Sequence, residues 1–161
     1  MRVPTPLSDQ RGTSLVEFAL ILPVLLLVLF GLLSFAKAFN YWNDETHLAA
    51  EGARWAVVDS NPGGSQSLQQ YLQQQADTSE LRGLAVVCVS FPTNPDTGTS
   101  GHVGDPVTVT VKSNYAWMPF VSSKAGLSPT TAITGSATMR LEAPPTNYSA
   151  GSGGTRLMSG M

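Results

Sequence analysis

An uncharged apolar run, FALILPVLLLVLFGLLSFA, extends from Phe18 to Ala36 and constrains the fold more than any other feature of the chain. As a helix rising about 1.5 Å per residue it measures roughly 28 Å, close to the thickness of the hydrocarbon layer of a bilayer. The run therefore predicts one membrane span. The alternative is a secretory signal peptide, whose apolar core is shorter and precedes a cleavage site between small residues. Ser34-Phe35-Ala36 superficially resembles such a site, but bulky Phe39 follows it, so we favour an uncleaved span.

The charges that flank the run predict its orientation. Arg2 and Arg11 precede it together with the initial amine, whereas acidic residues predominate soon after it. Because basic residues favour the cytoplasmic side of a membrane, we expect the short N-terminal arm in the cytoplasm. Everything after about Lys37 is then expected outside the cytoplasmic membrane.

Two residues in and beside the run are unusual for a membrane helix. Glu17 lies at its entry, and a charge at the centre of a bilayer costs about 2.5–3.5 kcal/mol, less near the interface. Glu17 therefore either has a function or marks the cytoplasmic end of the span in the headgroup layer. Pro23 has no amide hydrogen, so the carbonyl of Ala19 loses its helical partner. This predicts either an ordinary kink or a hinge that changes when the helix packs against identical helices.

Composition limits the classes of function. A chain of 161 residues holds at most one modest domain beside the span, and its charged fraction of 12% is low, which is typical of exported proteins. The net charge of -2 gives no electrostatic reason to expect a nucleic-acid partner. Cys88 is the single cysteine, so an intrachain disulfide is impossible, and its apolar surroundings predict a buried core residue.

Beyond the span the helix is expected to continue over residues 37–60, with two apolar strips. One strip comprises Phe39, Trp42, Thr46, Ala49, Ala50, Ala53 and Val57. The second comprises Tyr41, Leu48 and Trp55, and the polar side comprises Asn40, Asp44, His47, Glu51 and Arg54. Two strips indicate either two partners, the chain's own domain and a neighbouring subunit, or complete coverage within one chain. Tyr41 and Trp42 also lie where an aromatic belt at the membrane interface is expected.

The remaining sequence predicts a small α+β domain over residues 61–142. The segment DSNPGGSQ, residues 59–66, ends the long helix, and Ser67 is a plausible N-cap of a short second helix over SLQQYLQQQADTSELRG. Three strand patterns follow and predict a three-stranded antiparallel sheet. They are the apolar run 84–91, expected to be buried on both faces, and the alternating segments 107–112 and 133–141. We expect an exposed turn-rich loop after the first strand, a short helical turn within residues 114–127, and a disordered tail over residues 143–161.

No motif gives a positive argument for an enzyme, and we expect no cofactor or metal. His47 and Glu51 are spaced as a helical ligand pair, but no further ligands accompany them, so a solvated helix face is favoured. His102 lies in a glycine-rich loop without a nucleophile motif near Ser90 or Ser100.

The N-terminal stretch RGTSLVEFALILPVLLLVLFGLLSFAKAF, followed by AAEGARWAVV, resembles TadE-like proteins, the pilin-like subunits of tight-adherence (Flp, type IVb) pilus systems. Their pattern is a short basic leader ending in glycine, four residues, a glutamate followed by an aromatic residue, and an apolar helix. Here Gly12, Glu17 and Phe18 supply this pattern, and Pro23 also matches. The segment SATMRLE, residues 136–142, is similar to a closing strand often seen in the family.

The resemblance implies that a prepilin peptidase cuts between Gly12 and Thr13, removing a cytoplasmic leader of residues 1–12 and leaving a transmembrane helix over residues 13–36. It further implies that Glu17 pairs with the new amine of Thr13, on its own chain or a neighbour's. The expected partners are this peptidase, other pilin-like subunits, the pilus assembly machinery and the membrane. Because a paired charge in an apolar bundle requires correct axial register, Glu17 then acts as a register device.

Two other functions are weighed against this structural one. The first is an uncleaved single-pass membrane-anchored protein whose extracytoplasmic domain binds a surface ligand, with Glu17 incidental. The second is an exported hydrolase using His102, which has the least support. Cleavage after Gly12 separates the leading hypothesis from both.

Overall fold

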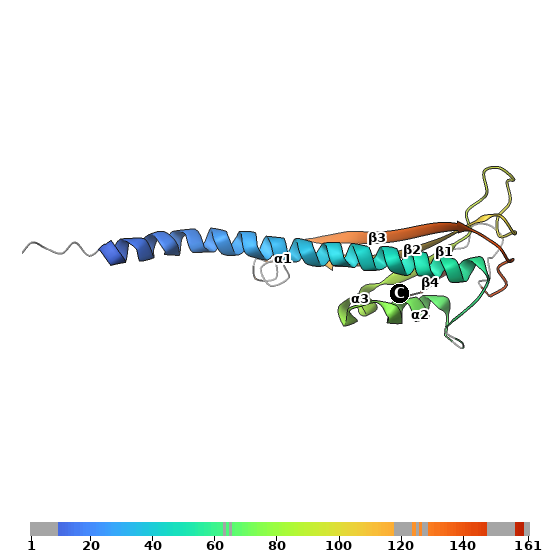
Figure 1. The fold of residues 1–161 in the computed structure, drawn as a ribbon, viewed down its shortest axis with the longest axis horizontal. Coiled ribbons are helices and arrows are strands. Elements are labelled where there is room, and N and C mark those ends of the chain that lie inside the picture. Colours follow the sequence, from blue (N-terminus) through green and yellow to red (C-terminus); the bar gives the residue numbers. More distant parts are fainter. Residues whose placement is uncertain are drawn as a thin grey trace, which may run out of the picture. The chain divides into compact units, whose positions relative to one another are not determined.

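The computed structural model describes residues 10–62, 64, 66–117, 124, 126, 129–147 and 157–159. The chain divides into two compact units, Met1–Ala36 and Lys37–Met161. One helix, α1 (Gln10–Val57), begins in the first unit and ends in the second (Figure 1). The first unit therefore consists, over its described residues, of the N-terminal part of α1.

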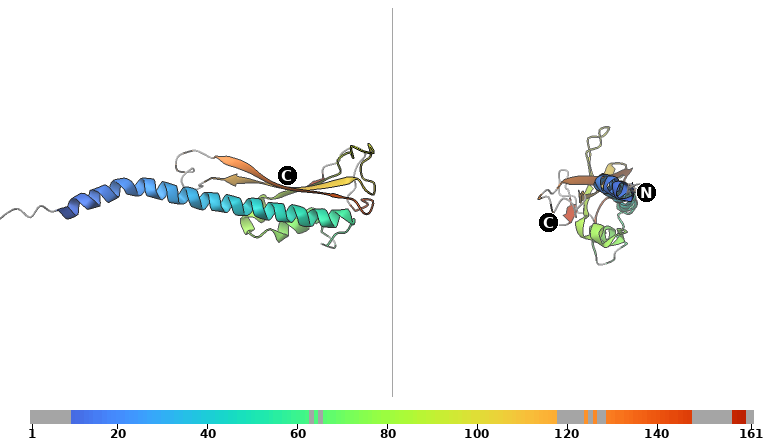
Figure 2. Two further views of the ribbon diagram at one scale, coloured as in Figure 1. Left: turned by 45° about the horizontal axis from the view of Figure 1, so that its top comes forward. Right: turned by 90° about the vertical axis from the view of Figure 1, so that its left-hand side faces the viewer.

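The second unit has a layer of helices packed on one face of an antiparallel sheet (Figure 2). Its further elements are α2 (Leu68–Gln75), α3 (Ser79–Leu84), β1 (Val86–Ser90), β2 (Pro106–Ala116), β3 (Thr130–Arg140) and β4 (Leu157–Ser159). The strand order is β3-β2-β1-β4, and all three pairings are antiparallel. The predicted α+β class, with a long N-terminal helix and a meander of three main strands, is confirmed.

The short helices begin at side-chain caps. The Ser67 hydroxyl accepts a hydrogen bond from the Gln70 amide, and the Gln70 side chain accepts one from the Ser67 amide, which completes a capping box. The sequence prediction of a single helix here was wrong, because Thr78 forms a second cap, on the Leu81 amide, and starts α3. A short connection between Gln75 and Thr78 therefore divides the predicted helix in two.

The face of α1 that packs on the sheet combines residues of both predicted strips. Tyr41 and Leu48, assigned to the second strip, are buried together with Ala49 and Ala53. The first strip does not face the core as a whole, because Phe39 and Trp42 are exposed. Helical spacing alone did not distinguish these two faces, since large apolar side chains occur on both.

Pairs of contacts fix the direction of the two longest strands against α1. A side chain at Gly52 would contact Val109 of β2, whereas nearer the start of the domain the Tyr41 ring contacts Tyr115. Strand β2 therefore runs opposite to α1 and β3, its antiparallel neighbour, runs with it. The closest approach is at Gly135 of β3, where an added Cβ would overlap the backbone of α1.

Strand β1 is buried on one face only, which corrects the prediction of burial on both. Val87 and Val89 are fully buried, whereas Val86, Cys88 and Ser90 alternate with them and are half-buried. The run looked continuously apolar because it joins the end of α3 to the strand. Cys88 is accordingly on the outer face of the sheet and is not the core residue that its apolar neighbours predicted.

The C-terminal segment differs in part from the prediction of a disordered tail. The amides of Glu142 and Ala143 donate to the carbonyl of Val57, at the end of α1. Residues 157–159 form β4 beside β1. The turn predicted within residues 114–127 falls mainly outside the described residues, although β2 extends as far as Ala116.

Candidate functional site

The N-terminal part of α1 presents an apolar surface without intramolecular cover. Among its described residues all large apolar side chains but one are exposed, from 39% at Leu26 to 73% at Leu20, and Leu22 is half-buried. Mean hydropathy over the most apolar window is 2.8, and none of that window is buried within the chain. The helix is therefore long and apolar enough to span a membrane. Burying such a surface in lipid or against other helices is favourable at about 25 cal/mol per Å².

Glu17 and Phe18 lie on α1 near the start of this surface. Both side chains are exposed, Phe18 by 59%. Glu17 is the single ionisable side chain between Thr13 and Ala36. It belongs to none of the ion pairs among the described side chains. A carboxylate in an apolar setting is costly unless it is paired, so the environment of Glu17 bears on the function of this surface.

The bond between Gly12 and Thr13 lies in the first turns of α1, which starts at Gln10. A side chain added at Gly12 would meet nothing within 4 Å. The first four amides of a helix have no intrahelical acceptor, so this end unwinds at little cost. Pro23 lies further along, and α1 continues on both sides of it. The structure thus places the predicted cleavage and assembly residues on one continuous helix.

A buried carboxylate on the domain part of α1 was not predicted from the sequence. Glu45 is fully buried, and its Oε1 accepts a hydrogen bond from Ser113 Oγ at 2.5 Å. Its Oε2 has no hydrogen-bond partner among the described residues. Burial, the largest cause, raises the pKa of Glu45 to about 7, although the Ser113 hydrogen bond opposes the shift.

Asp44, assigned to the polar side of the helix, is also buried, which corrects that prediction. Its Oδ2 accepts a hydrogen bond from the amide of Asp77 at 3.0 Å, in the connection between α2 and α3. The pKa of Asp44 is raised overall, because the effect of burial exceeds the opposing effect of the hydrogen bond from the Asp77 amide. Nearby, the Lys37 Nζ lies 2.6 Å from Glu80 Oε2 of α3 and 5.5 Å from the centre of the Tyr41 ring.

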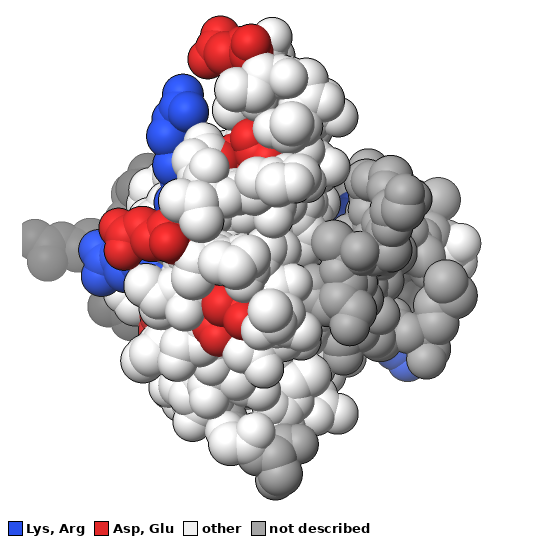
Figure 3. Space-filling view, turned by 90° about the vertical axis from the view of Figure 1, so that its right-hand side faces the viewer, with Lys and Arg blue, Asp and Glu red and all other residues white. Residues whose placement is uncertain are grey.

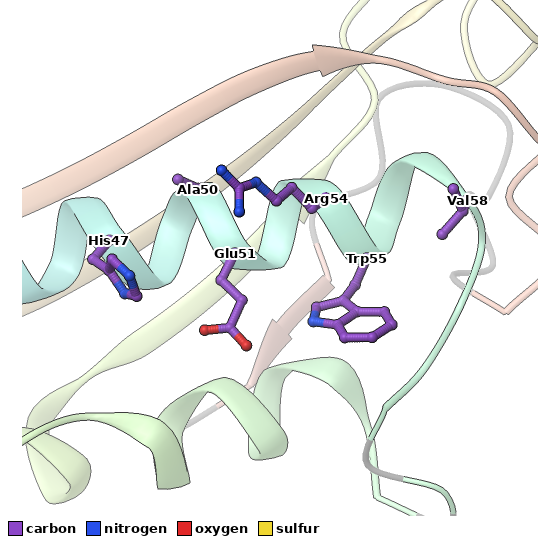
Figure 4. A pocket seen from close by; sticks show the side chains of 6 residues that line it. All are labelled: His47, Ala50, Glu51, Arg54, Trp55 and Val58. Carbon is purple, nitrogen blue, oxygen red and sulfur yellow. The ribbon is translucent and has the colours of Figure 1, made fainter.

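A shallow groove of about 400 Å³ follows the last turns of α1 (Figure 4). It is lined by His47, Ala50, Glu51, Arg54, Trp55 and Val58. His47 and Glu51, the pair with ligand spacing, both line it, and the described residues supply no cluster of three side chains suited to a metal ion. The groove is therefore an amphipathic face of α1, lined by both charged and apolar side chains.

The turn-rich loop between β1 and β2 is organised around Asp105. Its Oδ1 accepts hydrogen bonds from Asn94 at 3.0 Å and Thr99 at 2.9 Å, and Oδ2 accepts one from the His102 amide at 3.0 Å. Desolvation raises the pKa of Asp105, but these hydrogen bonds together lower it to about 2. The His102 ring is 73% exposed and lies 3.5 Å from Asp105. His102 thus takes part in a structural hydrogen-bond cluster.

The end of the domain seen in Figure 3 has scattered charges. Acidic and basic side chains occur singly among uncharged ones, with no continuous field of either sign on the described part of this face.

Comparison with known proteins agrees with the residues placed on α1. Residues 12–54 match the family model described as TadE-like protein, which confirms the resemblance drawn from Gly12, Glu17 and the apolar run. No significant match was found among curated proteins or among solved structures. The matched segment begins at the predicted cleavage glycine and ends within the last turns of α1.

Proposed function

We propose that this TadE-like protein, associated with tight-adherence pili, is a pilin-like structural subunit that a prepilin peptidase cuts between Gly12 and Thr13. The observation that carries the proposal is the exposed apolar surface of α1, which has one carboxylate, Glu17, at its start. In the precursor this surface is expected to lie in the cytoplasmic membrane. In an assembly it would pack against the helices of other subunits.

The location of Gly12 and Thr13 suits cleavage. A peptidase binds its substrate in an extended conformation, and the first turn of α1 can unwind without disturbing the packed domain. Glycine offers no side chain that would obstruct that conformation. The basic leader would stay in the cytoplasm, and the domain from Lys37 onward would lie outside.

Cleavage would create a positively charged amine on Thr13, four residues before Glu17. Side chains on a helix lean toward its N-terminus, so the Glu17 carboxylate would extend toward the end of the helix that carries the new amine and could pair with it within one chain. Pairing with the amine of a neighbour would instead fix the axial position of one subunit against the next. Either pairing offsets the cost of placing the Glu17 carboxylate in an apolar setting.

Mass spectrometry of membranes that contain the chain and a prepilin peptidase tests the cleavage. We expect a mature species beginning at Thr13, and we expect Gly12→Leu to abolish it. Gly31→Leu is the matched control, because Gly31 also has open space around its Cβ position but lies within the apolar run. A chain that stays intact under these conditions would favour an uncleaved membrane-anchored binding protein.

The role of Glu17 needs a second measurement on the same material. Glu17→Gln is expected to be cleaved normally but to be lost from cross-linked subunit complexes. Glu51→Gln, on the same helix in the domain, is expected to cleave and cross-link as the unmodified chain does. Normal complexes from Glu17→Gln would contradict the proposed pairing and leave the cleavage standing.

A further inference from the structure

Two aromatic side chains of α1 remain outside the core of the domain. Phe39 is 58% exposed and Trp42 is 49% exposed, and their ring centres lie 5.6 Å apart. Tyr41, between them in sequence, points into the core and is 1% exposed. Two residues were expected in an aromatic belt at the membrane interface. Tyr41 is buried and cannot contact lipid, whereas Trp42 is exposed on the helix surface beside Phe39.

The fold adds a third aromatic residue from a distant part of the sequence. The Tyr41 ring contacts Tyr115 with centres 5.4 Å apart, and Tyr115 contacts Trp117 at 5.1 Å. Because β2 runs opposite to α1, its last residues return to the level at which α1 enters the domain. Trp117 is half-buried, and its indole Nε1 donates to Thr131 Oγ1 at 2.7 Å.

Distance along α1 relates these rings to the bilayer. Counted from Ala36, the end of the apolar run, Trp42 lies about 9 Å further along the helix. The headgroup region adds roughly 5 to 7 Å beyond the hydrocarbon on each side. Phe39, about 4.5 Å beyond Ala36, lies within this layer, and because helical side chains lean toward the N-terminus, the Trp42 ring extends back toward its outer edge. Tryptophan is favoured there because its ring is apolar while its N–H is polar.

We propose that Phe39, Trp42 and Trp117 form a surface that contacts the lipid headgroups while the chain is anchored in the membrane. The proposal rests on the proposed membrane anchoring and extends it from the helix to the folded domain. Lipid is the occupant that chain continuity supports, since α1 runs unbroken from the apolar run into the segment that bears Phe39 and Trp42. The surface would hold the domain against the bilayer before assembly.

Depth-dependent quenching of tryptophan fluorescence tests the proposal. Three full-length variants each keep one tryptophan, Trp42, Trp55 or Trp117, with the other two changed to Phe, and are reconstituted in phosphatidylcholine vesicles with a nitroxide on the headgroup. Trp55 is the matched control, because it lies on the same helix about 28 Å beyond Ala36. We expect the nitroxide to quench Trp42 and Trp117 at least about twofold more than Trp55. Equal quenching at all three positions would overturn the proposal.

Two controls separate this outcome from other failures. Flotation of the same vesicles measures anchoring: loss of the chain from the lipid fraction contradicts the proposed membrane location, whereas flotation with equal quenching contradicts only the contact surface. Quenching is compared at the lowest protein density in the bilayer, so that contacts between copies do not cover the rings. If a variant unfolds, 5-fluorotryptophan in the unmodified chain allows nitroxide broadening to rank the same three positions.

Discussion

Ser113 Oγ donates a hydrogen bond of 2.5 Å to Glu45 Oε1, joining β2 to the buried face of α1 across 68 positions of sequence. Gly135 of β3 contacts the α1 backbone at the same place. Helix and both long strands therefore meet at one carboxyl group, and the stability of the domain should depend on both contacts.

Replacing Glu45 should remove a pH dependence of stability. Because burial raises the folded-state pKa from an ordinary 4.5 to about 7, the folded domain binds a proton that the unfolded chain releases. The stabilisation is complete below about pH 4.5 and is lost as the pH rises through 7. Between pH 4.5 and 8 the free energy of unfolding should therefore fall by up to about 3 kcal/mol more in the unmodified chain than in Glu45→Gln.

Denaturant unfolding of the full chain in detergent micelles, followed by circular dichroism, measures this difference. Groups other than Glu45 titrate in both proteins and largely cancel on subtraction. Glu51→Gln, which changes a less buried carboxylate on the same helix, should keep the pH profile of the unmodified chain. If the free energy of unfolding changed with pH in the same way in the unmodified chain and in Glu45→Gln, the raised pKa would not belong to Glu45.

Gly135→Ala should destabilise the domain strongly. The added methyl group would overlap backbone atoms of Glu45 and Thr46, which cannot move aside as a flexible side chain can. We expect a loss of about 3 kcal/mol in the free energy of unfolding. Gly83→Ala is the control, since that position in α3 is open and alanine favours helix, and it should be neutral or slightly stabilising. A Gly135→Ala protein as stable as this control would show that β3 does not press on α1.

Asp105→Ala should loosen the loop between β1 and β2. The Asn94 and Thr99 side chains and the His102 amide would all lose their shared acceptor. Hydrogen exchange of residues 94–104 should accelerate by at least about tenfold, while exchange in β2 stays unchanged. Asp96→Ala provides a comparison, because Asp96 is exposed and lies 4.0 Å from Arg140.

The Asp105 carboxylate also sets the pH range over which the loop between β1 and β2 stays ordered. Its pKa is depressed to about 2 from an ordinary 3.8, so its contribution is present above pH 3.8 and is lost as the pH falls through 2. Loop exchange, corrected for the intrinsic rate, should therefore stay constant from pH 7 down to pH 4. Loosening already at pH 5 would contradict the hydrogen-bonded arrangement.

Asp59→Ala should separate the C-terminal segment from the end of α1. Asp59 has φ of 51°, a conformation that alanine tolerates poorly, and its carboxylate accepts from the Thr146 hydroxyl and the Asn147 amide. We expect Asp59→Ala to lower the free energy of unfolding by about 1–3 kcal/mol. The variant Asp59→Asn should lose less, because asparagine adopts this conformation readily and retains a carbonyl acceptor. Equal losses in both variants would show that the acceptor has no part in the effect.

Local signals were sufficient to predict most of the elements. The apolar run, the Ser67 cap and the alternation of valine with threonine in β2 each depend on neighbouring residues, and the structure confirms them. The family resemblance likewise rests on contiguous residues, Gly12 to Phe18 and the run that follows. These features were accessible because their physical cause lies within a few residues of sequence.

Features that depend on distant partners were missed. Glu45 looks like one more charged residue beyond the span, and its burial follows only from Ser113 and Gly135, which approach it from two strands. The position of Trp117, near the point at which α1 enters the domain, follows only from the direction of β2, which the sequence did not reveal. Division of the second helix depended on Thr78, whose capping role competes with a continuous helix and is decided by the packing of Leu81.

The hydrogen bonds from Glu142 and Ala143 to Val57 have a consequence for the order of folding. The carbonyls of Trp55 and Ala56 accept from the nearby amides of Ser60 and Asp59, but the carbonyl of Val57, the last residue of α1, is capped by residues that follow the third strand. Local contacts alone therefore cannot complete this end of the helix. Closing so long a loop is entropically costly and slow relative to helix formation. During synthesis, α1 can form as soon as it emerges, whereas the packed domain must wait until nearly the whole chain has been made.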